Sequence, residues 1–201
     1  MCGFLLAEKV GFEEIGENEK KKTDKKEVER VSVSRIKSKI KDLAECNEFT
    51  FFFTQTLKYN RYDLNCFKKE IQRKFKAYKR KNKDFIYLII YEKHKDGAFH
   101  LHGLVGGIGE DFYINNNNYL SLAFFEDLGY NSLSKIKDKL KISNYITKYI
   151  TKDFEKTDTG YSYFHSKSLN VPLVETVKSI PKNCKLVFEN DYLKKWVIEN
   201  E

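Results

Sequence analysis

Two neighbouring apolar segments, residues 85–91 and 99–105, constrain the fold more than any other feature of the sequence. The first reads Phe-Ile-Tyr-Leu-Ile-Ile-Tyr, and an uninterrupted apolar run of this kind predicts a central strand that is covered on both faces. Asp96-Gly97 lies between the two segments and favours a tight reversal between antiparallel strands. The sequence therefore predicts a β-hairpin at the centre of a sheet, on which the other elements pack.

The remaining segments supply strands and helices for such a sheet. Apolar residues that recur at offsets of three and four predict helices over about 30–43, 64–81, 131–140 and 145–152. Aromatic and β-branched residues predict strands over 49–56 and 119–124. Residues 184–188 and 193–198 are expected to be two closing strands, or a strand and a short helix. The expected fold class is α+β, a central antiparallel sheet with helices packed on it.

Residues 1–29 differ in composition from the rest of the chain. From Glu17 to Glu29 nearly every side chain is charged or polar, which is typical of a solvated linker. We therefore expect an N-terminal extension, residues 1–29, whose role the sequence leaves open, followed by a single domain, residues 30–201.

The composition of the chain limits the classes of partner that we expect. The 201 residues carry a formal net charge of +8, which favours a polyanion such as nucleic acid, although an ordinary lysine-rich surface is the alternative. Four cysteines without a CxxC spacing indicate neither a zinc framework nor a disulfide framework. No apolar stretch approaches the roughly 18 residues of a membrane span, and the N-terminus is a poor signal peptide. We expect a cytoplasmic protein that contacts no membrane.

The second segment of the hairpin carries a histidine pair, His100-Leu101-His102. Alternate residues of a strand share a face, so the two imidazoles can share one divalent ion. A two-residue turn would place Lys93 opposite His100, whereas a three-residue turn would place Glu92 opposite His102 and His94 opposite His100. We favour the second register, because it supplies a third ligand: Glu92, with His94 as the competing candidate. The alternative is a pair of structural sheet histidines.

A repeated Tyr-x-x-Lys pattern occupies residues 145–152. At about 100° per residue, a helix places four of these side chains within one arc: Tyr145, Lys148, Tyr149 and Lys152. The isoleucines at 142, 146 and 150 lie on the neighbouring arc and would pack on the sheet. A free phenol, with a pKa near 10, is a poor nucleophile unless a cation stabilises the phenolate. The alternative is an amphipathic helix with lysines at its margins.

Two weaker signals lie upstream of the hairpin. Thr54, Gln55 and Thr56 end an otherwise apolar strand, where they can hydrogen-bond a ligand or merely mark the exit of the strand. Arg35 and Lys39 occupy the basic side of the first helix, which would follow a DNA backbone or simply face solvent.

Taken in this order, the three motifs resemble those of the HUH endonucleases, the rolling-circle replication initiators (Rep proteins) of phages and plasmids. His100-Leu101-His102 is similar to the family's histidine motif, and Tyr145 with Tyr149 to its two-tyrosine branch. The segment from Phe53 to Thr56 is similar to the family's threonine-containing strand, although Gln55 stands where a hydrophobic residue is usual. The resemblance covers about residues 34–153.

The resemblance implies a metal-dependent endonuclease that nicks and joins single-stranded DNA on a sheet related to the RRM and ferredoxin-like folds. It implies a Mn²⁺ or Mg²⁺ ion on His100, His102 and Glu92, and an attack by Tyr145 or Tyr149 that leaves a 5′-phosphotyrosine. Lys148 and Lys152 would steady the phosphate or the phenolate.

The implied partner is single-stranded DNA of a replication origin, in the cytoplasm of a bacterial host. Thr54, Gln55, Thr56, Arg35 and Lys39 would contact it. The sequence has no Gly-x-x-x-x-Gly-Lys-Ser/Thr loop, so a separate helicase is expected. The alternatives are a non-catalytic single-stranded nucleic-acid binder of RRM-like fold, and an HUH transposase or relaxase.

Overall fold

The computed structural model describes residues 5–9, 25–150, 163–172, 184–190 and 193–198. Contacts within the chain divide it into two units, one of residues 1–24 with 172–201 and one of residues 25–171. The larger unit contains the three sequence motifs. Within the described part of the chain, no helix has the length and apolar character needed to cross a membrane.

The larger unit is built on a seven-stranded antiparallel sheet, which confirms the predicted α+β class. Its strand order is β5-β6-β7-β2-β4-β3-β8. The strands are β2 (Phe51–Thr56), β3 (Ile86–Lys93), β4 (Phe99–Gly106), β5 (Phe112–Ile114), β6 (Leu120–Leu122), β7 (Asn131–Lys135) and β8 (Tyr163–His165). The predicted hairpin, β3 with β4, lies between β2 and β8.

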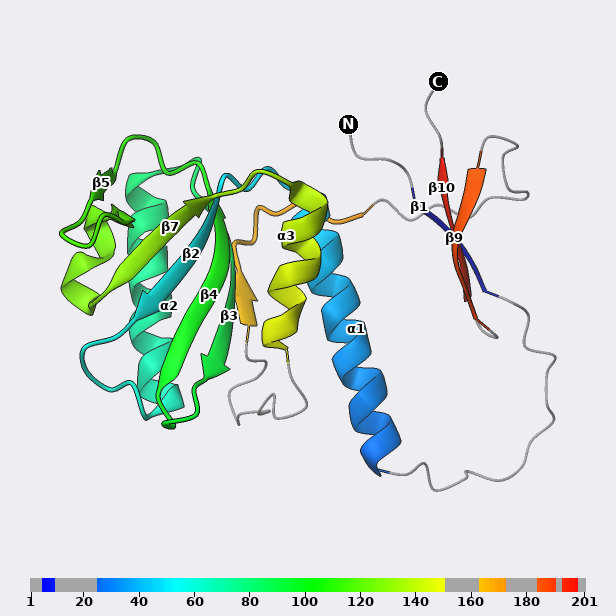
Figure 1. Cartoon of the computed structure of the whole chain (residues 1–201), viewed down its shortest axis with the longest axis horizontal. Helices are drawn as coiled ribbons and strands as arrows, with labels where there is room; N and C mark the ends of the chain where they lie inside the picture. The colour runs from blue at the N-terminus through cyan, green and yellow to red at the C-terminus, as the bar shows by residue number, and fades with distance from the viewer. Residues whose placement is uncertain (1–4, 10–24, 151–162, 173–183, 191–192, 199–201) are drawn as a thin grey trace. The chain divides into compact units, whose positions relative to one another are not determined.

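Helices cover the two faces of this sheet (Figure 1). On one face lies α2 (Leu64–Lys81), whose first turn is capped by Asp63, which accepts hydrogen bonds from the backbone N–H groups of Asn65 and Cys66. On the other face lie α1 (Lys25–Glu45) and α3 (Lys139–Ile146). The two faces divide the core by strand alternation: Ile89 and Leu101 pack with α2, whereas Leu88 and Leu104 pack with α1 and α3.

The register of the hairpin differs from the one we expected. Glu92 pairs with His100, and Ile90 pairs with His102. The turn is three residues long, as favoured, but it comprises residues 95–97, because the N–H of His94 donates to the carbonyl of Ala98 at 2.7 Å. Gly97 adopts the predicted left-handed conformation, with φ +86°. The predicted pairs were wrong by two residues, a shift that leaves every side chain on its expected face.

The segment after the hairpin departs from the predicted helices. Residues 131–135 form strand β7 rather than the start of a helix, because Asn131 and Leu133 are buried while Ser132 and Ser134 alternate with them. The predicted strand at 119–124 is confined to β6, since a 3₁₀ helix, η1 (Ala123–Leu128), begins directly after it.

The predicted helix at 145–152 is the end of an earlier one. α3 begins at Lys139, where Asp138 accepts a hydrogen bond from the N–H of Lys141, and a 3₁₀ turn, η2 (Thr147–Tyr149), follows Ile146. Lys152 lies outside the described residues.

The smaller unit contains an antiparallel sheet of β1 (Leu5–Lys9), β9 (Cys184–Asn190) and β10 (Leu193–Ile198), in the order β1-β10-β9. Both C-terminal segments are therefore strands. This division differs from the expected boundary after residue 29, because α1 already begins at Lys25 and β1 pairs with β10.

Candidate functional site

A polar group of side chains lies on the α1/α3 face, where β2, β3 and β4 run side by side. Thr54 pairs with His102 across the strands, and Thr56 pairs with His100. The hydroxyl of Thr56 lies 3.1 Å from Nδ1 of His100, and the hydroxyl of Thr54 lies 3.4 Å from Nδ1 of His102. Each imidazole is therefore held through Nδ1 by the opposed threonine, and a ligand would bind through Nε2, which in His102 already contacts Glu92.

Glu92 joins this group from β3. Although it is paired with His100, its Oε2 lies 2.8 Å from Nε2 of the diagonal neighbour, His102. The competing candidate, His94, places its ring 4.9 Å from the ring of His100, but its side chain is 57% exposed and its Nδ1 lies 3.5 Å from Asp96. Glu92 is thus the acidic residue that the fold brings to the histidine pair.

Both histidines are held toward the neutral state. Burial lowers the pKa of His102, although the Glu92 carboxylate opposes this shift. Burial also lowers the pKa of His100, and the nearby His94 lowers it further. Neutral imidazole is the form that ligates metals, so the site favours the protonation state that a metal would require.

Tyr149 stacks directly on His102, one member of the histidine pair. Its ring lies 3.9 Å from the ring of His102, at an interplanar angle of 15°, and its hydroxyl donates a 2.8 Å hydrogen bond to the hydroxyl of Tyr145. The predicted anchor of this segment is present, since Ile146 and Ile150 are fully buried. The structure therefore brings together both tyrosines and the histidine pair.

The two tyrosines differ in environment. Burial, the hydrogen bond to Tyr145 and the negative charge of Glu92 all raise the pKa of Tyr149. Tyr145 is 40% exposed, and the ammonium of Lys148 lies 5.1 Å from the centre of its ring. Lys148 is therefore positioned beside Tyr145, the more accessible phenol.

Phe52 is a site residue that we did not predict. Its ring contacts the rings of His102, Tyr145 and Tyr149, at centroid distances of 5.9, 5.5 and 6.2 Å. Strand alternation could have identified it, because Phe52 lies two residues before Thr54 and therefore on the same face.

Gln55 has a different role from its two neighbours. It is fully buried on the opposite face, where its amide nitrogen donates to the carbonyls of Thr56 and Tyr130, at 3.1 Å each. This placement ties β2 to the start of β7 and does not fit the DNA contact that we expected.

Arg35 and Lys39 lie one turn apart on α1, and both are exposed. Within the described part of the chain, no hydrogen bond, ion pair or ring contact connects either of them to the residues of the site. Their role in DNA binding stays a prediction.

The donor atoms fit a divalent ion in chemistry, because two imidazole nitrogens and a carboxylate are ligands of Mn²⁺ and related ions. Among the residues that the structure describes, no three His, Cys, Asp or Glu side chains are already arranged as a metal site. Instead, Glu92 and His102 form a hydrogen-bonded pair. Metal binding would exchange this hydrogen bond for two bonds to the ion.

Comparisons with known proteins identify the family of the chain. The model of one protein family, the replication-associated protein ORF2 family, matches residues 50–154, a range that runs from β2 past the two tyrosines. No curated protein and no solved structure matches the chain. The match covers more than half of the sequence and contains all three motifs, and the chain belongs to this ORF2 family of rolling-circle replication initiators.

Proposed function

We propose that this initiator nicks and rejoins single-stranded origin DNA by a metal-dependent transesterification through a tyrosine. The observation that carries the proposal is the stacking of Tyr149 on His102, with its hydroxyl bonded to that of Tyr145. Two candidate nucleophiles thus lie beside the two imidazoles that would hold the ion. Membership of an initiator family implies nicking and joining in general, and the tyrosine chemistry is our proposal.

The proposed ligands of a Mn²⁺ or Mg²⁺ ion are Glu92, His100 and His102. The hydrogen bond between Glu92 and His102 supports Glu92 over the exposed His94 as the third ligand. The hydroxyls of Thr54 and Thr56 would keep both imidazoles oriented. When bound, such an ion stabilises the negative charge that develops on a scissile phosphate.

We propose Tyr145 as the first nucleophile. Its side chain is 40% exposed, its oxygen accepts the hydrogen bond from Tyr149, and the Lys148 ammonium lies over its ring. Tyr149 has a raised pKa and keeps its proton. As the Tyr145 oxygen attacks phosphorus, its proton passes to solvent, the bond to the 3′ oxygen breaks, and that oxygen takes up a proton.

The products are a 5′-phosphotyrosine and a free 3′-hydroxyl that a polymerase can extend. Tyr149, one helical turn away, would attack in a second round, and Lys152 would assist as the sequence pattern suggests. A separate helicase would unwind the duplex, and transposition or mobilisation would use the same chemistry on another DNA.

Covalent trapping tests the proposal. The protein is incubated with a labelled single-stranded library of randomised sequence and Mn²⁺, and adducts are separated on a denaturing gel. We expect an adduct that requires the metal, is lost in the Tyr145→Phe variant and persists in Tyr149→Phe. Tyr119→Phe is the matched control, because this tyrosine is 54% exposed and lies on the segment before β6.

An adduct that forms in the presence of EDTA, or in the double variant Tyr145→Phe/Tyr149→Phe, would overturn the proposal. Binding of the library without any adduct would favour the second candidate, a non-catalytic nucleic-acid binder. The specific observation in its favour is the Glu92–His102 hydrogen bond, which is also the arrangement of a structural histidine pair.

A further inference from the structure

We propose that a cavity beside Tyr145 binds one nucleotide of the single-stranded DNA, next to the phosphate that is cut. The proposal rests on the proposed function and names the substrate contact of that site. The cavity has a volume of about 570 Å³ and is formed by β2, β7, the segment that joins β7 to α3, and α3 itself. This volume lies within the range of about 300–1,000 Å³ that is typical of small-molecule sites.

One part of the cavity lining is apolar. It includes Phe52, Ile136 and Ile142, which are partly buried and pack against the core under α1 and α3. Such a surface fits the sugar and base of a nucleotide, which are the uncharged parts of the ligand.

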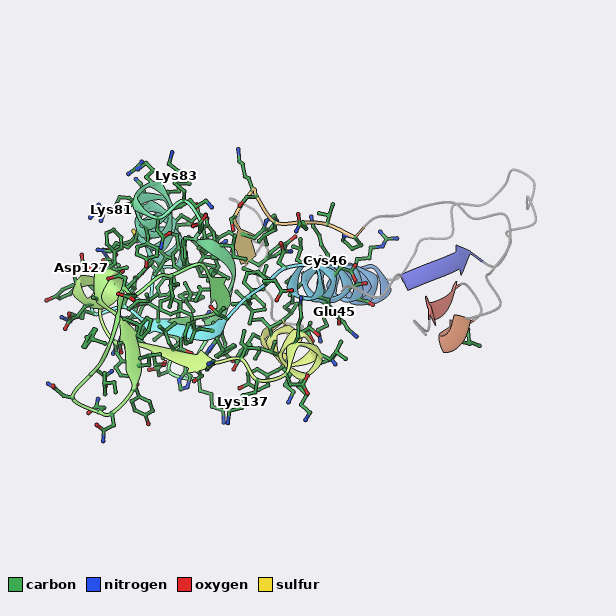
Figure 2. All side chains as sticks on the ribbon, turned by 90° about the horizontal axis from the view of Figure 1, so that it is seen from above. Glu45, Cys46, Lys81, Lys83, Asp127 and Lys137 are labelled. Carbon is green, nitrogen blue, oxygen red and sulfur yellow. The ribbon has the colours of Figure 1, made fainter. Side chains whose placement is uncertain are left out.

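The other part of the lining is basic. Lys135 and Lys137 are exposed, and neither forms an ion pair with any residue that the structure describes. Figure 2 shows Lys137 projecting from the segment between β7 and α3. The third lysine, Lys141, is different, because its Nζ lies 3.4 Å from the carboxylate of Asp138. The positive charges of Lys135 and Lys137 thus remain for an anion. Together with the apolar part of the lining, they favour a ligand that combines phosphate groups with an uncharged portion, as a nucleotide does.

The cavity is continuous with the candidate site through two shared residues. Thr54 lines the cavity and contacts His102, and Tyr145 lines the cavity and accepts the hydrogen bond of Tyr149. A nucleotide in the cavity would therefore hold its neighbouring phosphate close to the Tyr145 hydroxyl. Because the cavity and the candidate site are continuous, we infer that the occupant is a nucleotide within a DNA strand rather than a free nucleotide.

Salt-dependent binding tests the cavity independently of catalysis. A short fluorescein-labelled oligonucleotide of randomised sequence is titrated with protein in EDTA, and its anisotropy is followed over a range of salt concentrations. Each lost phosphate contact lowers the slope of log K against log salt by about 0.7 for single strands, so we expect a decrease of about 1.4 in Lys135→Ala/Lys137→Ala. The matched control is Lys69→Ala/Lys76→Ala, which removes two exposed lysines of α2 on the opposite face of the sheet.

A second variant fills the cavity without changing its charge. Ser134 is exposed on β7, pairs with Phe52 and lines the cavity. We expect Ser134→Phe to weaken oligonucleotide binding about tenfold, because the apolar part of the nucleotide loses its place. Unchanged far-UV circular dichroism would show that the variant is folded.

The cavity proposal is overturned if the lysine pair and its control change the salt slope equally, or if Ser134→Phe binds as the wild-type protein does. Because these measurements need neither metal nor tyrosine, they can support the cavity even if covalent trapping fails. Conversely, suppose that the wild-type protein forms the covalent adduct but Lys135→Ala/Lys137→Ala leaves the salt slope unchanged. This result would support the proposed function and contradict nucleotide binding in the cavity.

Discussion

The two faces of the β3–β4 hairpin use the same strands for different purposes. On the α2 face, Tyr91, Phe99 and Leu101 are buried and belong to an apolar cluster that reaches the end of the strands. On the α1/α3 face, their immediate neighbours Glu92 and His102 are polar and lie beyond the apolar cluster under the two helices. Stability and chemistry are therefore separated by strand alternation rather than by distance along the chain.

The largest expected effect on stability lies on the α2 face. Phe75 is fully buried and contacts five aromatic rings, those of Phe53, Phe85, Tyr87, Phe125 and Phe164. We expect Phe75→Ala to lower the free energy of unfolding by about 3–5 kcal/mol, since it leaves a cavity among these rings. Urea unfolding followed by circular dichroism measures the change. A loss below that of Phe52→Ala, on the other face, would contradict the comparison.

The threonines of the other face should affect metal binding instead. We expect Thr54→Val/Thr56→Val to lower Mn²⁺ affinity about 10–100-fold, because the imidazoles lose the hydroxyls that orient them. Isothermal titration with Mn²⁺ measures this affinity. Thr50→Val is the matched control, because the Thr50 hydroxyl contacts the carbonyl of Val105 and no histidine. Equal losses in both proteins would show that the hydroxyls do not position ligands.

Gln55 tests whether a polar residue on the structural face matters to chemistry. We expect Gln55→Met to cost about 1 kcal/mol of stability, because two hydrogen bonds are lost while one unpartnered buried oxygen is removed. Covalent trapping should yield as much adduct as the wild-type protein. A selective loss of adduct, with stability unchanged, would assign Gln55 to the site after all.

The smallest expected effect is on the pH dependence of stability without metal. Both histidines have a pKa in the folded protein below that of the unfolded chain, so the unfolded chain binds more protons between the two values. Stability should therefore decrease as the pH falls below about 6.5, the unperturbed value. Urea midpoints at neutral and mildly acidic pH measure the decrease, which should be smaller in His100→Gln/His102→Gln. An equal decrease in this variant would assign the effect to other groups.

Much of the fold could be predicted because its elements have clear periodicity. The central strand and α2 occur where their apolar patterns placed them. β7 was mistaken for a helix because Leu133 and Ile136 are three residues apart, and only pairing with β2 decides the true period. The hairpin register could not be predicted either, since it depends on whether residue 95 or residue 98 belongs to the turn.

The candidate site was predictable at the level of residue type and strand face. Glu92, His100 and His102 share a face in any register of the correct parity, and the two tyrosines are one turn apart on any helix. Strand alternation already separates Phe52 from Gln55, and the pairing of β2 with β4 shows that Phe52 shares the face of the two histidines. The diagonal contact of Glu92 with His102 depends on rotamers, which no sequence pattern specifies.

The three-residue turn at 95–97 determines which insertions and deletions the hairpin can accept without moving its site residues to the other face. When a change in turn length shifts the pairing of β3 with β4 by two residues, the side chains stay on the same face of the sheet. When the shift is one residue, the side chains of the shifted strand move to the opposite face. A slip of two positions would keep Glu92 on the face of the imidazoles, whereas a slip of one would place its carboxylate on the face of the aromatic core. Insertions and deletions in this loop are therefore limited to those that preserve the alternation, and position 97 must also accept the left-handed backbone conformation of Gly97.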